Sequence, residues 1–213
     1  MFNNKQDFIE FILSEKILKF GNFTLKSGRQ SPYYFNTGLC HNGELITKLS
    51  SYYASYITQK ALEFDFIFGP AYKGITLCSS ISQSLFVNHQ LNKPYAFNRK
   101  EKKDHGDMGQ FVGCDISGSA LIVDDVVSSG SSIIESIDLI NEKKSKCHDV
   151  LVAFDRMEIG TSKMASLELH SEYNTVVHSI INLDDIADVV KSKSEYKSFI
   201  NAMNDYMSTY RSV

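Results

Sequence analysis

Ala120-Leu-Ile-Val-Asp-Asp-Val-Val-Ser-Ser-Gly-Ser-Ser132 is the stretch that decides how this chain of 213 residues folds. Its first residues are apolar and predict a buried strand, which runs directly into two adjacent carboxylates, Asp124 and Asp125. Gly130 permits a tight turn of converging backbone N–H groups, and the helix expected next adds the positive end of its dipole. We therefore expect a phosphate at the hydroxyl-rich turn formed by Ser128, Ser129, Gly130, Ser131 and Ser132. The carboxylates would repel a phosphate, so we expect them to face neutral hydroxyls or a metal ion.

Strands and helices alternate on both sides of this stretch. Apolar runs predict strands at 64–68, 95–97, 119–123, 150–154 and 175–181, and longer periodic segments predict helices at 43–62, 74–88, 131–143 and within 183–210. This alternation predicts a single α/β domain with a mostly parallel sheet, helices on both faces, and ligands at the carboxyl ends of the strands.

The segment before the alternating part has a different pattern. We expect an N-terminal helix that ends before Gly21, and then short strands at 23–25 and 32–36 that form a small hood. The domain would thus have a hood at approximately 1–40, joined by C-terminal elements, and a core at approximately 43–181.

Composition excludes several classes of protein. Hydrophobic residues make up 43% and charged residues 22% of the chain, which is ordinary for a globular protein. A formal net charge of -3 gives no basic field for nucleic acid, and no apolar run is long enough to span a membrane. Four dispersed cysteines and the lack of a signal peptide lead us to expect a reduced, cytoplasmic setting.

A second loop, Gly69-Pro-Ala-Tyr-Lys-Gly-Ile-Thr76, also follows a predicted strand and opens a helix. It nearly spells a nucleotide-binding P-loop, but Ile75 stands where the phosphate-binding lysine should be, so we reject that assignment. Lys73 and the backbone around Gly74 still suit an anion. A tight turn with an exposed lysine is an equally good interpretation of the loop taken alone.

A charged segment, 98–110, has no core-forming period. Within it Arg99, Lys100, Lys102, Lys103 and His105 crowd into seven positions. We expect a solvated loop that is mobile when empty and that closes over an anionic leaving group as a lid, excluding water.

These motifs together resemble the type I phosphoribosyltransferases, and the resemblance to orotate phosphoribosyltransferases covers nearly the whole chain. It implies a type I phosphoribosyltransferase fold and Mg²⁺-dependent transfer of the 5-phosphoribosyl group from 5-phosphoribosyl 1-diphosphate to orotate. In that family the two acids contact the ribose hydroxyls, and the following residues, here Val126, Val127 and the serines, cradle the 5'-phosphate. The family usually has threonine where this chain has Ser128 and Ser131.

The resemblance also assigns roles to the two charged loops. The Gly-Pro loop, with Tyr72 and Lys73, would hold pyrophosphate, often through a strained non-proline cis peptide. The lid would contribute Arg99, Lys100, Lys103 and His105, with Lys103 as the main catalytic residue. In the family this lid reaches into the neighbouring subunit, so a homodimer is implied. Met108 departs from the commoner lid sequence, which often has glycine there.

Orotate is planar and carries a carboxylate, so its site needs hydrogen-bond donors and a flat apolar wall. The run Phe23 to Asn36 resembles the hood of bacterial orotate enzymes, in which Lys26, Tyr34 and Phe35 face the substrate. Arg156 matches the family's orotate-binding arginine, and a guanidinium suits a planar carboxylate. The alternatives are that Tyr34 and Phe35 are hood core, and that Arg156 forms a surface ion pair with Asp155 or Glu158.

No residue is assigned as a certain metal ligand. We expect Mg²⁺ to be held mainly by the sugar diphosphate, near Asp124 and Asp125. Two rival functions stay open at this point: a purine phosphoribosyltransferase of the same fold, and a non-catalytic regulator that senses the sugar diphosphate.

Overall fold

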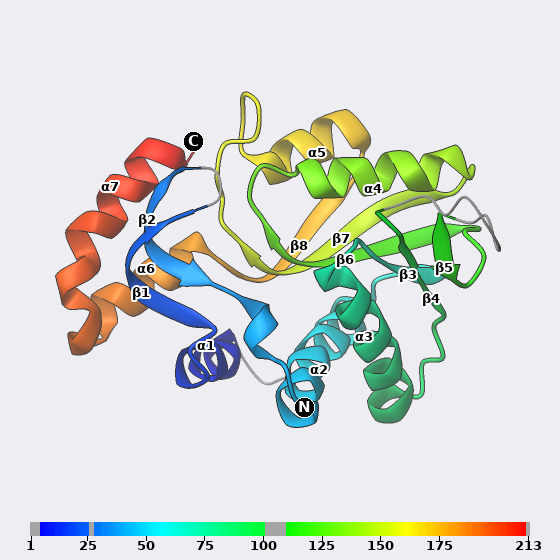
Figure 1. Ribbon diagram of the computed structural model, residues 1–213, viewed down its shortest axis with the longest axis horizontal. Helices are drawn as coiled ribbons and strands as arrows, with labels where there is room; N and C mark the ends of the chain where they lie inside the picture. Colours follow the sequence, from blue (N-terminus) through cyan, green and yellow to red (C-terminus); the bar gives the residue numbers. More distant parts are fainter. Residues whose placement is uncertain (1–4, 26–27, 101–109, 212–213) are drawn as a thin grey trace.

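A computed structural model describes residues 5–25, 28–100 and 110–211 (Figure 1). The helices are α1 (Lys5–Ser14), α2 (Gly43–Lys60), α3 (Lys73–His89), α4 (Ser131–Glu142), α5 (Ala165–Tyr173), α6 (Leu183–Ser192) and α7 (Ile200–Tyr210), with short 3-10 helices η1 (Thr37–Leu39) and η2 (Ser194–Phe199). The strands are β1 (Leu18–Thr24), β2 (Gln30–Phe35), β3 (Phe66–Gly69), β4 (Tyr95–Asn98), β5 (Phe111–Gly113), β6 (Ser119–Val127), β7 (Lys146–Asp155) and β8 (Val176–Asn182). Among these described helices none has the length and apolar character needed to cross a membrane.

The central sheet has six strands in the order β5-β4-β3-β6-β7-β8. All neighbouring pairs are parallel except β4 and β5, which pair antiparallel. The expected α/β fold with a mostly parallel sheet is therefore confirmed. The edge strand β5 was not predicted, because three residues between a charged segment and a glycine give too short a pattern to recognise.

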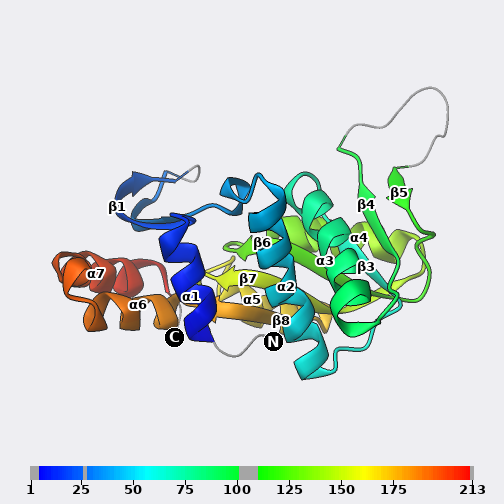
Figure 2. The same ribbon diagram turned by 90° about the horizontal axis from the view of Figure 1, so that it is seen from below.

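Helices cover both faces of this sheet, with α4 and α5 on one face and α2 and α3 on the other (Figures 1 and 2). The central strand β6 shows why both faces are needed. Leu121 and Val123 are fully buried on the side of α2 and α3, whereas Ala120 and Ile122 are buried on the side of α4. Because successive strand residues point to opposite faces, a continuous apolar run requires cover on both.

The hood is a separate two-stranded antiparallel sheet of β1 and β2, on which α7 packs. The N-terminal helix ends before Gly21, as expected, but it stops already at Ser14, and Gly21 does not cap it because that residue lies within β1. Lys16 takes a left-handed conformation with φ of 57°, and Leu18, which is buried, already pairs with Phe35. The buried leucine thus belongs to the strand although its spacing fits the helix.

Candidate active site

Three neighbouring parallel strands, β3, β6 and β7, end at the same edge of the sheet. The loop between β3 and α3, the turn between β6 and α4, and Arg156 just beyond β7 follow these ends. Since the carboxyl ends of adjacent parallel strands lie together, the fold brings the three segments singled out from the sequence to one place.

The two carboxylates lie within β6, which extends to Val127 rather than ending at 123 as expected. Register with β7 continues through Val126 and Val127, which pair with Phe154 and Asp155, so backbone pairing holds the acids in extended conformation. Their side chains consequently meet different neighbours. The Ser132 hydroxyl donates to Asp124 at 3.3 Å, whereas Asp125 accepts from other elements.

Asp125 contacts two polar side chains from other elements at this edge. Its Oδ2 accepts from Lys73 Nζ at 2.5 Å and from Thr37 Oγ1 at 3.1 Å. The Asp125 carboxylate is buried, and roughly half of the Lys73 side chain is exposed. Lys73 therefore joins the carboxylate pair, which the sequence did not indicate, and Thr37 is a polar contact that sequence reasoning missed.

Burial raises the pKa of Asp124 to about 7, and the negative charge of Asp125 adds to the increase. Hydrogen bonds from the Asp125 backbone N–H, at 2.9 Å, and from Ser132 act in the opposite direction but do not cancel it. A carboxyl that titrates near neutrality can hold or release a proton when a ligand arrives.

The turn after β6 has the geometry of an anion site. Gly130 precedes α4 with φ of 81°, a left-handed conformation that glycine adopts without steric cost. Helix α4 begins at Ser131 with no side chain capping its first turn and with no acidic residue in that turn. Its first backbone N–H groups are thus available to an anion, and the hydroxyls of Ser129 and Ser131 lie 3.2 Å apart beside them.

Val126 and Val127 have a different relation to the site, because their side chains pack into the cores on the two faces of the sheet. Val127 is almost fully buried, and its carbonyl accepts from the Arg156 backbone N–H at 3.1 Å. Val127 could therefore contact a ligand only through its backbone groups, whereas Val126 is partly buried.

The Gly-Pro loop contains a cis peptide bond between Ala71 and Tyr72, which confirms the expectation of a non-proline cis peptide. Gly69 and Gly74 are in such close contact that a Cβ on Gly69 would lie 2.0 Å from the Gly74 carbonyl oxygen. The Asn98 side chain accepts from the Ala71 N–H at 2.9 Å. These contacts leave Tyr72 exposed at the start of α3, next to Lys73.

The lid is described only at its two ends, where the Arg99 N–H donates to the Gln110 carbonyl at 2.8 Å. Lys100 places its ammonium 5.1 Å from the ring centre of Tyr72, so the lid begins beside the Gly-Pro loop. A cavity of about 540 Å³ separates these segments from α4 and is lined by Pro70, Ala71, Asn98, Arg99, Lys100, Gln110, Ser132, Glu135, Ser136, Asp138 and Leu139. Lys103 and His105, together with Lys26 of the hood, lie outside the described residues.

The two aromatic candidates of the hood differ in burial. Phe35 is buried and packs on Phe154 at the end of β7, with ring centres 5.3 Å apart. Tyr34 is 40% exposed and packs on Phe23 with ring centres 5.5 Å apart. Phe35 therefore belongs to the core that seats the hood on the sheet, and Tyr34 presents a flat surface to solvent.

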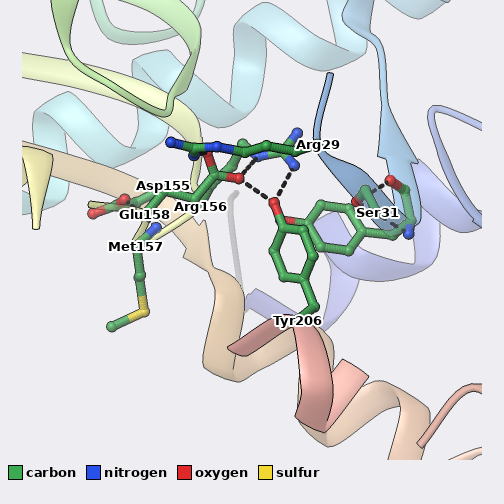
Figure 3. Close-up of polar contacts among 8 residues, drawn as sticks. Arg29, Ser31, Asp155, Arg156, Met157, Glu158 and Tyr206 are labelled. Atoms are coloured by element: carbon green, nitrogen blue, oxygen red, sulfur yellow. Dashed lines mark hydrogen bonds and ion pairs between the residues drawn. The ribbon is translucent and has the colours of Figure 1, made fainter. Parts of the chain in front are cut away.

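Arg156 is buried and not, as the alternative had it, in a surface ion pair. It does pair with Glu158, because its Nε donates to Oε1 at 2.6 Å, and its Nη2 donates to the Tyr206 hydroxyl at 2.6 Å (Figure 3). Arg29 of the hood donates to the other Glu158 oxygen, Oε2, at 2.6 Å. Burial raises the pKa of the Tyr206 hydroxyl, so it remains a donor to Glu158 at neutral pH.

Sequence reasoning did not assign Arg29, Glu158 or Tyr206 to the site. Glu158 had a signal, since it lies two residues from Arg156 in the sequence and was considered as a partner. Tyr206 had none, because it comes from a helix in the part of the chain where no site residues were expected. Within the described ranges 5–25, 28–100 and 110–211, no three histidine, cysteine or acidic side chains gather as metal ligands.

Comparison with known proteins gives a consistent result over most of the chain. The family model for the phosphoribosyl transferase domain matches residues 39–197. The orotate phosphoribosyltransferase of Pasteurella multocida is 43% identical over 207 residues, which cover 97% of each chain, and one from Haemophilus influenzae is 44% identical with the same coverage. Among solved structures, the orotate phosphoribosyltransferase of Francisella tularensis has a TM-score of 0.85 and 37% identity, covering 97% of this chain and all of that one.

Proposed function

The chain belongs to the orotate phosphoribosyltransferases, a group within the phosphoribosyltransferase family. We propose below which of its residues bind each substrate and which stabilise the leaving group. It transfers the 5-phosphoribosyl group from 5-phosphoribosyl 1-diphosphate to orotate, which yields orotidine 5'-monophosphate and pyrophosphate for pyrimidine nucleotide synthesis. The observation that carries this assignment is identity of 43% or more with named relatives over nearly the full length of both chains.

The donor binds across the ends of β3 and β6 in this proposal. The turn Ser128 to Ser132 and the start of α4 take the 5'-phosphate, while Asp124 and Asp125 face the ribose hydroxyls. Lys73 takes the diphosphate. The 2.5 Å contact between Lys73 and Asp125 supports this arrangement, because the diphosphate is bonded to C1 of the ribose and its ligands must lie beside those of the sugar.

Orotate binds between the hood and the end of β7. Arg156 meets its carboxylate, for which a guanidinium offers two parallel N–H groups. Tyr34, whose ring is partly exposed, supplies the flat wall, and Lys26 adds a further donor. Phe35 does not contact orotate in this proposal, and it holds the hood in place by packing on Phe154.

The transfer itself requires no covalent step by the protein. The deprotonated ring nitrogen of orotate attacks C1, the bond from C1 to the diphosphate oxygen breaks, and pyrophosphate leaves with the electron pair. Positive charge develops on the ribose in the transition state. Lys103, His105, Arg99 and Lys100 stabilise the departing diphosphate and, as a closed lid, keep water away from the sugar.

Mg²⁺ fits this site only as a companion of the sugar diphosphate. Asp124 and Asp125 offer the oxygen ligands that Mg²⁺ prefers, but the described residues lack the third acidic side chain of a dedicated protein site. When bound, the ion supplies positive charge that stabilises the leaving diphosphate. The protein's own part is to place the carboxylates of β6 next to the donor's ribose.

We further propose that the enzyme works as a homodimer in the cytoplasm, with lid residues shared between subunits. The four cysteines are all free, as expected in a reduced compartment. Mixing the impaired Lys103→Ala and Arg156→Ala variants tests the shared lid, because a mixed dimer contains one site with both native residues. Recovery of activity on mixing supports the proposal, and no recovery from variants that form dimers contradicts it.

The decisive experiment for the reaction follows orotate absorbance after the sugar diphosphate and Mg²⁺ are added to purified protein. A Mg²⁺-dependent decrease with matching release of pyrophosphate is the expected result. Turnover of guanine or hypoxanthine without turnover of orotate would instead support a purine enzyme. Binding of the sugar diphosphate without turnover of any base would support a regulator.

A further inference from the structure

A cluster of four polar side chains, all buried except the partly exposed Arg29, links three distant parts of the chain (Figure 3). Glu158 is 2% exposed and accepts from Arg156, from Arg29 and from the Tyr206 hydroxyl. The Tyr206 hydroxyl in turn accepts from Arg156 Nη2 at 2.6 Å. Arg29 comes from the hood, Arg156 and Glu158 follow β7, and Tyr206 belongs to α7.

These contacts define the plane and the rotation of the Arg156 guanidinium. Its Nε donates to Glu158 and its Nη2 to Tyr206, so two hydrogen bonds hold the edge of the guanidinium that carries Nε and Nη2. Its face lies over the ring of Tyr33, with the guanidinium carbon 4.9 Å from the ring centre. A guanidinium has five N–H donors in a fixed fork, so these two bonds leave donors for a ligand.

The charges of the cluster also point to an anion. Two guanidinium groups share one carboxylate, while the neighbouring Asp155 accepts from the Met157 backbone N–H at 2.8 Å. The hydrogen-bonded set therefore has one positive charge more than its own carboxylate balances. Orotate brings a single carboxylate of the opposite sign.

We propose that Glu158 and Tyr206 are positioning residues for orotate: they hold the Arg156 guanidinium so that its remaining donors meet the orotate carboxylate, and they make orotate binding depend on helix α7. This inference rests on the role given to Arg156 under the proposed function. Arginine loses considerable rotamer freedom when it is fixed, so a partner that fixes it beforehand lowers the entropic cost of binding.

A purely structural role does not account for the arrangement as well. Buried ion pairs are weak sources of stability, because the desolvation of both charges offsets their attraction. A tyrosine that accepts from the arginine and donates to its carboxylate partner adds orientation, which matters for a planar, two-point contact. Orienting Arg156 is thus a role of the cluster in addition to any part that it has in folding.

The test uses Tyr206→Phe in the full-length enzyme, which removes one hydroxyl and keeps the ring. We expect KM for orotate to rise about tenfold, as for loss of a hydrogen bond to a charged group, with KM for the sugar diphosphate within about twofold of wild type. Tyr210→Phe is the matched control on the same helix, since it keeps the ring that contacts Tyr206 and Arg29 and removes a hydroxyl for which no hydrogen bond occurs among the described residues. Glu158→Gln, which keeps the shape but loses the charge, is expected to raise KM for orotate as well.

Arg156→Ala separates this inference from the proposed function. If Arg156→Ala leaves KM for orotate unchanged, the proposed role of Arg156 is wrong. If Arg156→Ala raises it and Tyr206→Phe does not, the positioning role alone is overturned. Equal increases in KM for both substrates with Tyr206→Phe would show a general structural defect and would also overturn it. When Tyr206→Phe is combined with Arg156→Ala, it should have no further effect on KM for orotate, because the guanidinium that Tyr206 positions has been removed.

Discussion

Asp124→Asn is predicted to make the substrate-free enzyme more stable at alkaline pH while it lowers activity. The carboxyl of Asp124 is largely buried next to Asp125, and both effects raise its pKa to about 7. An asparagine fits the same contacts, because its carbonyl can accept from the Asp125 N–H and its amide can donate to the Ser132 hydroxyl. The substitution therefore removes a costly buried charge and few hydrogen bonds.

The magnitude and sign follow from the shift in pKa. Relative to the ordinary value of 3.8, the carboxyl is raised by about three units, worth roughly 4 kcal/mol at 1.36 kcal/mol per unit. The folded state keeps this proton to higher pH than the unfolded state, so the stability of the native enzyme falls between pH 3.8 and about 7 and is constant above. The stability of the Asp124→Asn variant does not fall in this way, because its side chain has no carboxyl to titrate. Its advantage is therefore about 4 kcal/mol at pH 8, about 2 kcal/mol at pH 5, and vanishes below the unfolded pKa.

The assay is thermal unfolding without substrates or Mg²⁺ at pH 5 and pH 8. In a chain of this size about 4 kcal/mol corresponds to an increase in Tm of roughly 10 °C at pH 8, with about half of that at pH 5. Asp188→Asn is the control, because the Asp188 side chain is 79% exposed and its removal should alter Tm little at either pH. An increase in Tm that is the same at both pH values, or a decrease at pH 8, would refute the argument.

Three further predictions concern Lys73 and Lys103 of the site and Glu168, which lies outside it. Lys73→Met should raise KM for the sugar diphosphate about tenfold or more, with little change for orotate, because it removes a cation beside Asp125; steady-state kinetics check this. Glu168→Gln should lower Tm at pH 7, since the carboxylate accepts from backbone N–H groups of 161–163, which lower its pKa to about 2. The difference from wild type should disappear as pH falls from about 4.5 to about 2, because protonation removes the same charge. Lys103→Ala should lower kcat far more than it weakens orotate binding, and equal turnover would exclude the lid from the mechanism.

The parts of the fold and site that could be predicted are local in sequence. The strand, acids, turn and helix start from Ala120 to Ser132 lie within thirteen residues, so their order can be predicted from the local pattern. The Gly-Pro loop is also local in sequence, because its two glycines in close contact, Gly69 and Gly74, lie within a span of six residues. In both cases glycine stands where a side chain would clash or strain the backbone, and such positions can be recognised without knowledge of distant partners.

The parts that were missed depend on distant partners. Thr37 reaches Asp125 across 88 positions, and Arg29 reaches Glu158 across 129. Nothing in either local sequence indicates such a contact, since Thr37 is an ordinary polar residue at the start of η1 and Arg29 an ordinary one just before β2. The continuation of β6 through the acids has the same origin. Two adjacent carboxylates favour a loop by composition, but pairing with β7 overrides that preference.

The charges in the substrate-free site favour orotate over a neutral purine as the acceptor substrate. Lys73 already pairs with Asp125, and Arg156 shares Glu158 with Arg29, so each cation has a carboxylate partner although the Glu158 cluster keeps one positive charge in excess. A ligand that displaces or shares these partners must supply its own negative charge, otherwise a carboxylate or a guanidinium would lose compensation in a partly buried place. The diphosphate satisfies this requirement at Lys73 and the orotate carboxylate satisfies it at Arg156. A neutral purine offers no such charge, so the ion pairs that order the free enzyme also act against the wrong base.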